Sequence, residues 1–483
     1  MEFVGPERLE KPVALEAKAR AFSSRVVAVT FLLDGRPLGS VTTRPYKLDV
    51  DPALIVPGSH RVSVTAVDNL GRRATSAPST VTVASTRGDR LVEATPETFQ
   101  RVTGRLRGGD VTVRLGPGRY PVRELEVGPR VRLVGSGPKT VLTARPGRYW
   151  ALVVARGSGI RISDLAIDGR GGPATEDGGI AVAVFDGSRD VRLQRLEIRR
   201  VRTHGVNVWG AHAGVSIQDS SIEGGGTAHA GVFTLGSDRS RDTSVIRTQI
   251  RGFRSYGILL GQKKFGRPAA ALHGLALDNR ISDIRDPARD GCVYAARTTR
   301  GCGTNEGGIW TGGVEAAIIG NTVRRARWDG IETVGSSTRT RIVDNEISRT
   351  RTGIYVEHST NRSLISRNVI VDAETGINVE WFHEGAGSRR NAFVANRIVR
   401  AREVGLFVDV GGDRNRIEGN VFVGGGRPAI VLQGSSGNVV RRNLGCGGPG
   451  TSLVGLQSAR WDDGTEAHAR ANRLERNTTA ATC

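Results

Sequence analysis

Three acidic side chains in the C-terminal half of the chain recur at nearly constant spacing. The segment 353–357, Gly-Ile-Tyr-Val-Glu, returns as Gly-Ile-Asn-Val-Glu at 376–380, 376 − 353 = 23 positions later. Glu357 and Glu380 therefore hold equivalent places, and Asp409 holds the same place one repeat further on. Two neighbouring carboxyl groups, one protonated and one ionised, are the acid and the base or nucleophile of glycoside hydrolysis. This spacing makes hydrolysis of a sugar polymer the first chemistry to consider.

The repeat extends over most of the chain, which predicts the element that positions these acids. A Gly-aliphatic motif begins at Gly205, Gly231, Gly257, Gly308, Gly330, Gly353, Gly376 and Gly405. An Asn-x-aliphatic motif begins at Asn279, Asn321, Asn345, Asn368, Asn396, Asn420 and Asn443. A fixed phase and a period in the low twenties predict the rungs of a parallel β-helix, with Asn bonding at a tight turn and to the Asn of the next rung.

Side chains alternate along a strand, so the second and fourth residues after each Gly are expected to point outward. The second positions are Asn207, Phe233, Leu259, Trp310, Glu332, Tyr355, Asn378 and Phe407. The fourth positions are Trp209, Leu235, Gly261, Gly312, Val334, Glu357, Glu380 and Asp409. These positions contain no Arg although the chain is rich in it, which favours a face that binds sugar rings over a solvated surface. The alternative is a face covered by insertions, with its acids paired to Arg.

The catalytic candidates centre on Glu380, with Glu357 and Asp409 as partners. Second-line candidates near the same face are Glu332, Asp329 and His383. The residues expected to bind sugar are Trp209, Phe233, Trp310, Tyr355, Asn378, Trp381 and Phe407. No cofactor is required by this chemistry, although a Ca²⁺ ion between Glu357, Glu380 and Asp409 is an alternative to a protonated acid.

Weaker candidates lie on the same repeats. His204 is interpreted as a turn histidine, His358 stands beside Glu357, and Lys263 and Lys264 are interpreted as loop charges.

The net charge of the chain bears on the kind of molecule that it binds. Lys and Arg exceed Asp and Glu by 69 − 48 = 21, which fits either an acidic polysaccharide or a generally Arg-rich surface. Nucleic acid is disfavoured because aromatic residues make up only 5% and no basic arm is evident. No apolar stretch reaches membrane-spanning length. The charge alone does not choose between these partners, and nothing in the sequence predicts an oligomeric state.

The four cysteines suggest an oxidising compartment. They are not spaced as metal ligands, and their positions predict the disulfides Cys292–Cys302 and Cys446–Cys483, with buried free thiols as the alternative. We therefore expect a secreted or cell-surface protein. Because the first residues have no signal-peptide core, the signal would have to precede this numbering.

Three segments are expected. Residues 1–86 alternate in strand fashion and carry Asp34-Gly35, Arg44-Pro45-Tyr46, Gly58-Ser59-His60 and Ala66-Val67-Asp68-Asn69-Leu70-Gly71. On these motifs the segment resembles bacterial immunoglobulin-like modules, which implies a small β-sandwich, often a spacer. Residues 87–446 are expected to form the β-helix, in which 97–108 cap the first rung. Residues 447–483 are expected to form a C-terminal cap or tail.

The repeats at 353–380 and the Asn column resemble the right-handed parallel β-helix superfamily of polysaccharide lyases, glycoside hydrolases and related proteins. The resemblance implies an all-β chain whose polysaccharide substrate lies along one strand face. The better-known signatures of polygalacturonases, alginate epimerases and pectate lyases are absent. Three functions stay open: a glycoside hydrolase, a Ca²⁺-dependent lyase or epimerase acting on a polyuronate, and a non-catalytic carbohydrate-binding module of the envelope.

Overall fold

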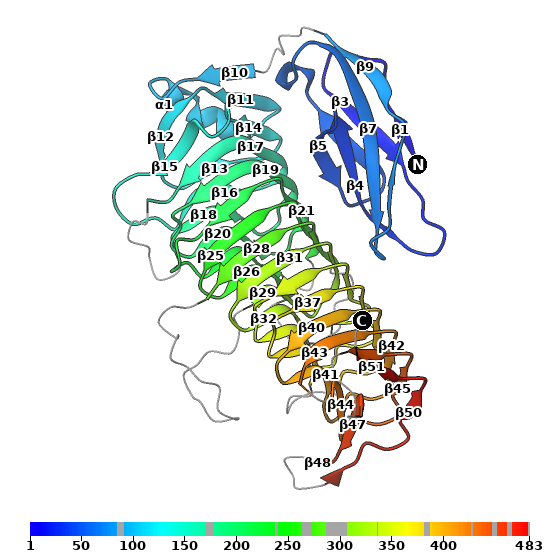
Figure 1. Cartoon of the computed structure of the whole chain (residues 1–483). Coiled ribbons are helices and arrows are strands. Elements are labelled where there is room, and N and C mark those ends of the chain that lie inside the picture. Colours follow the sequence, from blue (N-terminus) through cyan, green and yellow to red (C-terminus); the bar gives the residue numbers. More distant parts are fainter. Residues whose placement is uncertain are drawn as a thin grey trace.

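The structure is a computed structural model of the whole chain. It describes residues 1–84, 91–170, 178–236, 240–262, 273–285, 307–335, 337–380, 387–426, 428–446, 452–460 and 466–481. A small β-sandwich lies alongside a long parallel β-helix (Figure 1). The predicted fold class, a right-handed parallel β-helix preceded by a sandwich, is confirmed. No helix in these ranges is long and apolar enough to cross a membrane.

The N-terminal sandwich packs two sheets around its own apolar core. Its sheets have the strand orders β1-β3-β6 and β2-β9-β7-β4-β5, with β8 paired to β7. Tyr46, Phe31 and Leu48 lie in the core between the sheets. The elements are β1 (Glu2–Val4), β2 (Arg8–Leu9), β3 (Val13–Lys18), β4 (Val26–Leu33), β5 (Arg36–Val41), β6 (Tyr46–Val50), the short 3-10 helix η1 (Pro52–Leu54), β7 (Gly58–Asp68), β8 (Arg73–Thr75) and β9 (Ser79–Val83).

Two faces of the β-helix are formed by one continuous 27-stranded sheet, which bends between them. Its strands are β10 (Leu91–Ala94), β11 (Val111–Leu115), β12 (Gly118–Val122), β14 (Val131–Val134), β15 (Thr140–Ala144), β17 (Ser158–Asp168), β19 (Arg189–Arg199), β21 (Ala213–Gln218), β22 (Ser221–Glu223), β24 (Arg241–Ile246), β25 (Gln249–Phe253), β27 (His273–Leu277), β28 (Arg280–Ile284), β30 (Glu315–Ile319), β31 (Thr322–Ala326), β33 (Arg341–Val343), β34 (Glu346–Ser348), β36 (Leu364–Ser366), β37 (Val369–Val371), β39 (Ala392–Val394), β40 (Arg397–Ala401), β42 (Arg416–Glu418), β43 (Val421–Gly425), β45 (Val439–Arg441), β46 (Leu444–Cys446), β50 (Arg473–Glu475) and β51 (Thr478–Ala480).

The third face, called the site face below, is a 13-stranded parallel sheet. Its strands are β13 (Leu125–Val127), β16 (Ala151–Ala155), β18 (Ile180–Val184), β20 (His204–Gly210), β23 (Ala230–Gly236), β26 (Tyr256–Gln262), β29 (Gly307–Gly312), β32 (Asp329–Val334), β35 (Thr352–Val356), β38 (Thr375–Val379), β41 (Val404–Val408), β44 (Ile430–Gln433) and β47 (Val454–Gln457).

The Gly-aliphatic motif marks the site face because the core leaves no room for a side chain at the Gly. A Cβ atom on Gly353 would meet the carbonyl oxygen of Gly376 and the Cγ2 atom of Ile370, each at 2.5 Å. The aliphatic residue that follows, Ile354, is fully buried in the core. The Gly-aliphatic motif therefore marks, in each rung, the strand that belongs to the site face.

The Asn column forms the ladder that the sequence predicts. The Nδ2 atom of Asn368 donates to Asn396 Oδ1 and to the Ile342 carbonyl oxygen, both at 2.9 Å. Its Oδ1 atom accepts from the backbone N–H of Asn345 at 3.0 Å. The same bonds link Asn279, Asn321, Asn345, Asn368, Asn396, Asn420, Asn443 and Asn477. Since these amides are mostly buried, the ladder satisfies the polar groups of the bend between the two faces.

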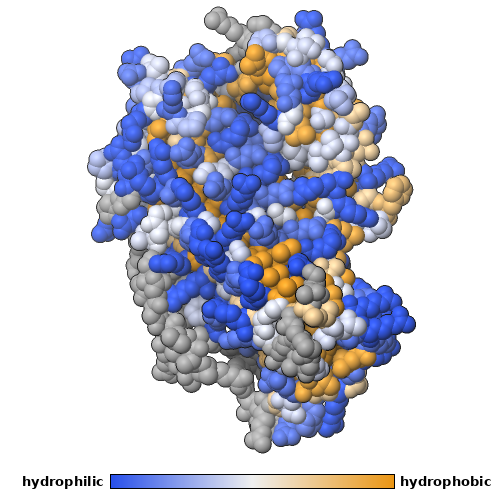
Figure 2. Space-filling view, in the orientation of Figure 1, coloured by the Kyte–Doolittle hydropathy of each residue, from blue (hydrophilic) through white to orange (hydrophobic). Residues whose placement is uncertain are grey.

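Much of the positive charge belongs to ion pairs between neighbouring rungs. Arg and Asp alternate at turn positions with left-handed φ values between 48° and 59°. The pairs, at 2.6 or 2.7 Å, are Arg195–Asp164, Arg247–Asp219, Arg325–Asp283, Arg367–Asp344 and Arg400–Asp372. Hydrophilic residues accordingly dominate the face of the molecule shown in Figure 2. These pairs account for part of the Arg content without an anionic partner.

The two ends of the β-helix differ. At the N-terminal end, α1 (Phe99–Val102) and the 3-10 helix η2 (Thr103–Arg107) bury Phe99 and Leu106 in the core, within the segment predicted as a cap. At the C-terminal end, β47, β50 and β51 continue the sheets, and β48 (Ala459–Arg460) pairs with β49 (Glu466–Ala467). The strands at 454–457, 473–475 and 478–480 therefore continue the rungs where a cap or tail was expected, and Asn472-Arg473-Leu474 repeats the Asn-x-aliphatic motif there.

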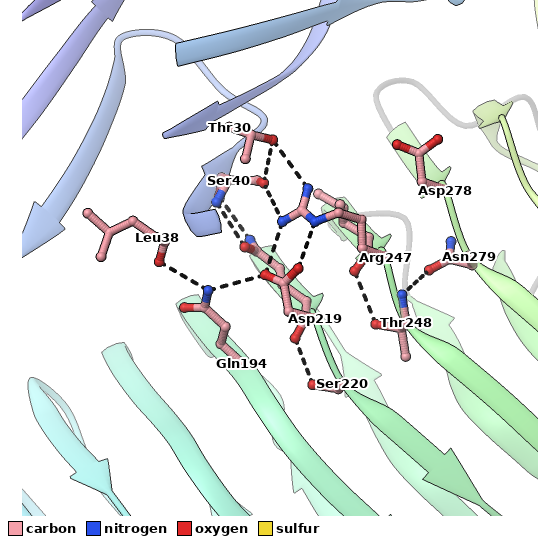
Figure 3. A network of polar contacts seen from close by, with 12 residues as sticks. Thr30, Leu38, Ser40, Gln194, Asp219, Ser220, Arg247, Thr248, Asp278 and Asn279 are labelled. Atoms are coloured by element: carbon pink, nitrogen blue, oxygen red, sulfur yellow. Dashed lines mark hydrogen bonds and ion pairs between the residues drawn. The ribbon is translucent and has the colours of Figure 1, made fainter. Parts of the chain in front are cut away.

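The sandwich is docked on the 27-stranded sheet, as Figure 3 shows. Arg247, paired with Asp219, donates to the hydroxyl oxygens of Thr30 at 3.2 Å and Ser40 at 3.1 Å. Gln218 exchanges two 2.9 Å hydrogen bonds with the backbone of Ser40. An apolar cluster joins Val27, Ala28 and Val67 to Ile246, Leu275, Leu277, Ala317, Ile319 and Val343. The sandwich is therefore joined to the β-helix by an apolar and a polar interface.

Candidate active site

The register of the site face stacks the predicted residues as the repeat requires. Glu332 pairs with Tyr355, which pairs with Asn378, which pairs with Phe407. At the strand starts, Asp329 pairs with Thr352 and with Gly307. Paired residues on neighbouring rungs lie about 4.8 Å apart. The charges of Glu357 and Glu380 act on Asp329, which places it near the predicted acids.

Glu332 is the most buried acid of the group. Its side chain is 2% exposed, and its Oε1 atom accepts a 3.0 Å hydrogen bond from the indole N–H of Trp310. Burial raises the pKa of Glu332 well above its usual value, and the charges of Asp329 and Glu357 raise it further. With its pKa raised in this way, Glu332 is expected to stay protonated.

Asp329 is the acid with a pKa suited to proton transfer near neutral pH. Burial raises its pKa from 3.8 to about 7, against a hydrogen bond with Thr352 that lowers it. The charges of Glu357 and Glu380 also raise this pKa, so Asp329 lies within electrostatic reach of both. An acid that holds its proton until about pH 7 can serve as a general acid.

Tyr355 and Asn378 orient the carboxylate of Glu380. The Tyr355 hydroxyl donates to Glu380 Oε2 at 2.8 Å, and the Asn378 side-chain N–H donates to the same atom at 3.1 Å. Burial, together with the charges of Glu357 and Glu380, raises the pKa of the Tyr355 phenol well above 10. Tyr355 therefore stays a donor at all physiological pH values, and Glu380 is held as an acceptor by two donors.

Glu357 and Asp409 have different surroundings. Glu357 is 8% exposed and lies 3.2 Å from the Nδ1 atom of His358. Asp409 turns back to its own backbone, where its Oδ1 atom accepts from the N–H of Val410 at 2.8 Å. Tyr355 thus contacts Glu380, whereas the contacts given above for Glu357 and Asp409 are with the next residue in the chain. The partnership of Glu380 with Glu357 or Asp409 stays a prediction.

The side chains give no support to the calcium alternative. No three His, Cys, Asp or Glu residues in the described ranges are placed to hold a metal ion together. Glu357, Glu380 and Asp409, all within the described ranges, form no such group. Burial, with the charges of neighbouring acids, raises the pKa values of Asp329 and Glu332, so both are expected to hold protons near neutral pH.

The middle of the site face is closed, unlike the open stacking surface that the sequence predicts. Trp310 and Leu259 are each 4% exposed and form an apolar cluster with Tyr256, Ala230 and Val334. Phe233 packs against this cluster and lies 4.6 Å, centroid to centroid, from the ring of His204. Trp310 therefore lines the acid cluster as a wall and offers no open ring face.

His204 belongs to this closed region. Its Nε2 atom lies 3.3 Å from the Nδ1 atom of His229. Burial lowers the pKa of His204 to about 3, and burial lowers that of His229 to about 4. Both rings are neutral at physiological pH, and His204 lies at the start of strand β20 where a turn histidine was expected.

Several predicted residues lie outside the described ranges: Trp381, His383, Lys263, Lys264, Cys292, Cys302 and Cys483. Cys446 is disulfide-bonded, while its pairing with Cys483 and the Cys292–Cys302 bond stay predictions.

Sequence reasoning missed the first rungs of the site face. Trp150 and Phe185 lie there beside Trp209. The signal was weak because Ala181, one rung before Gly205 by the strand register, breaks the Gly-aliphatic motif. The register of the strands, once known, adds these residues to the face.

Residues 151–438, more than half of the chain, match the family model described as "Periplasmic copper-binding protein (NosD)". The chain belongs to the NosD family. No match to this NosD-family protein is found among curated proteins.

Solved structures with a similar fold are distant in sequence. The family 28 exopolygalacturonase of Yersinia enterocolitica is 10% identical over 97% of this chain and 96% of its own, with a TM-score of 0.43. The A-module of the mannuronan C-5 epimerase AlgE6 of Azotobacter vinelandii is 13% identical over 80% and 94%, with a TM-score of 0.39. Bacteriophage phi29 gene product 12 in its pre-mature form is 13% identical over 74% and 53%, with a TM-score of 0.47. At these scores none of the three carries an argument about the reaction.

The family description raises the question of copper. Copper sites in proteins favour imidazole, thiolate and thioether ligands. Met1 is the only methionine of the chain, and Cys446 is held in a disulfide. His204 and His229 are a close pair, but no third His, Cys, Asp or Glu in the described ranges joins them in a metal-binding group. The described residues of this NosD-family chain therefore do not fit a copper site.

Proposed function

We propose that this protein is an exported glycoside hydrolase that cleaves a polysaccharide bound along the site face. The observation that carries the proposal is the pairing of two unlike acids. Asp329 keeps its proton up to a pH of about 7, and Glu380 is held as an acceptor by Tyr355 and Asn378. Glycoside hydrolysis requires one carboxyl group of each kind.

In this proposal Asp329 gives its proton to the oxygen of the scissile glycosidic bond. The carboxylate of Glu380 faces the developing positive charge at the anomeric carbon, where it activates a water molecule or attacks the carbon. Glu357 lies between them along the ladder, and its negative charge helps to keep the proton on Asp329.

The polyuronate alternative is less well supported. A lyase or epimerase needs a base for the C5 proton and positive charge to hold the uronate. The cation beside the cluster, Arg351, lies 4.7 Å from the ring centroid of Trp328 and 3.5 Å from the carboxylate of Glu374. Its charge is already engaged, and the neighbouring acids would repel a uronate.

The experiment is a screen of neutral and acidic polysaccharides for released products. Hydrolysis gives new reducing ends without ultraviolet absorbance, whereas a lyase gives an unsaturated product that absorbs. Binding without any product would instead support the non-catalytic envelope module. The family description as periplasmic supports the exported location, which fractionation of the native host would test.

A further inference from the structure

We propose that an aromatic hollow at the N-terminal end of the site face binds a neutral sugar residue of the same polysaccharide. The inference rests on the proposed function and adds a second subsite several rungs away from the acids. The hollow has a volume of about 430 Å³ and is lined by Trp150, Phe185, Trp209, Arg156, Val154, Glu124 and Glu126. This volume lies within the range of small-molecule pockets, roughly 300–1,000 Å³.

Three aromatic rings make the floor and wall of the hollow. The ring centroids of Trp150 and Trp209 are 5.6 Å apart at an interplanar angle of 40°. Phe185 meets Trp150 edge-on, with centroids 6.0 Å apart and an angle of 75°. All three side chains are partly exposed. Partly exposed aromatic faces, unlike the buried Trp310, are available to the C–H groups of a sugar ring.

The polar groups at the rim fit the hydroxyl groups of a neutral sugar. Glu124 and Glu126 are exposed and can accept hydrogen bonds from hydroxyl groups. The guanidinium carbon of Arg156 lies 4.1 Å from the ring centroid of Phe185, where its N–H groups can donate. Two carboxylates against one guanidinium leave this rim net negative, which disfavours a uronic acid. An organic cation is disfavoured because Arg156 already covers the Phe185 ring.

The register places this hollow on the same sheet as the acid cluster. Val154 pairs with Ala183, which pairs with Asn207, the first outward residue of the predicted column. From the β20 rung that carries Trp209 to the β35 rung of Tyr355 there are five rung steps, by way of β23, β26, β29 and β32. At about 4.8 Å per step the two sites are roughly 24 Å apart, which a chain of about six sugar rings would span.

The test measures binding to soluble neutral glucans, mannans, xylans and galactans, and to polygalacturonate and alginate as acidic polymers. We expect the full-length protein to bind a neutral polymer and Trp209→Ala to weaken that binding at least tenfold. Trp209→Phe, which keeps an aromatic ring, should lose less, and unchanged melting temperatures would show that both variants fold. Phe22→Ala is the matched control, because Phe22 is a fully exposed aromatic residue of the sandwich and should not alter binding.

The inference is overturned if the protein binds only the acidic polymers, if it binds none of the polymers, or if Trp209→Ala binds a neutral polymer as tightly as wild type. It is separable from the proposed function. Binding that depends on Trp209 but yields no product would contradict the proposed hydrolase and support the sugar-binding hollow. If Trp209→Ala hydrolyses a long polymer with the same KM as wild type, the sugar-binding hollow is contradicted and the proposed hydrolase is supported.

Discussion

The substitution Asp329→Asn should stabilise the protein increasingly as the pH rises. Burial raises the pKa of Asp329 from 3.8 to about 7. Below pH 3.8 the folded and unfolded chains both carry the proton. Between 3.8 and about 7 the unfolded chain releases it while the folded chain keeps it, so the free energy of unfolding falls with pH. Above about 7 the loss stays constant.

At 1.36 kcal/mol per pKa unit, the loss from Asp329 is about 1.5 kcal/mol at pH 5 and about 4 kcal/mol at pH 8. An amide does not ionise and escapes this loss. Loss of the hydrogen bond between Asp329 and Thr352 changes the unfolding free energy by the same amount at both pH values. Relative to wild type, Asp329→Asn should therefore gain about 2–3 kcal/mol of unfolding free energy between pH 5 and pH 8.

Denaturant unfolding of both proteins at pH 5 and pH 8 measures this difference. Asp168→Asn is the control. Burial acts to raise the pKa of Asp168, but Arg200, the backbone N–H of Arg170 and Arg199 outweigh it and lower the pKa below 3.8. Asp168→Asn should thus destabilise the protein equally at both pH values. A difference between Asp329→Asn and wild type that does not change with pH would refute the protonated buried acid.

Three further predictions concern the scaffold and the metal. Asn368→Ala orphans several buried polar groups and should lower the unfolding free energy by about 3 kcal/mol or more, whereas Asn477→Ala at the half-exposed end of the ladder should lower it less, as denaturant unfolding would show. Arg247→Ala removes the ion pair and hydroxyl contacts under the sandwich, so limited proteolysis should separate the two domains faster than in wild type; an unchanged rate would contradict the docking. Dialysis against a chelator should change the hydrolysis rate by less than about twofold, and a rate restored only by Ca²⁺ would revive the calcium alternative.

The rungs, the Asn ladder and the outward columns could be predicted because each follows from a repeat in the sequence. Glu357 and Glu380 share a register, and strand alternation fixes their face. The roles of the acids could not be predicted in the same way. Whether Glu332 or Asp329 keeps a proton depends on burial by residues such as Trp310, which belongs to a different rung. The spacing of residues within one strand does not tell how deeply each side chain is buried.

The aromatic hollow escaped sequence reasoning for another reason. Ala181 stands where later rungs have Gly, so the Gly-aliphatic motif begins only at Gly205, one rung further on. Trp150 precedes its strand and lies outside the alternating pattern altogether. Its contact with Trp209 depends on how the turn before β16 folds back onto the face, which no local pattern reports.

The rate at which Glu380→Gln releases reducing ends from the polysaccharide tests the central claim most directly. The amide is nearly isosteric, so the melting temperature should stay within a few degrees of wild type. Removing a positioned carboxylate should lower the rate at least about a hundredfold, the smaller end of what acid–base groups contribute. A Glu380→Gln protein that folds and hydrolyses the polysaccharide at the wild-type rate would show that the acid column is scaffold and that the reaction occurs elsewhere.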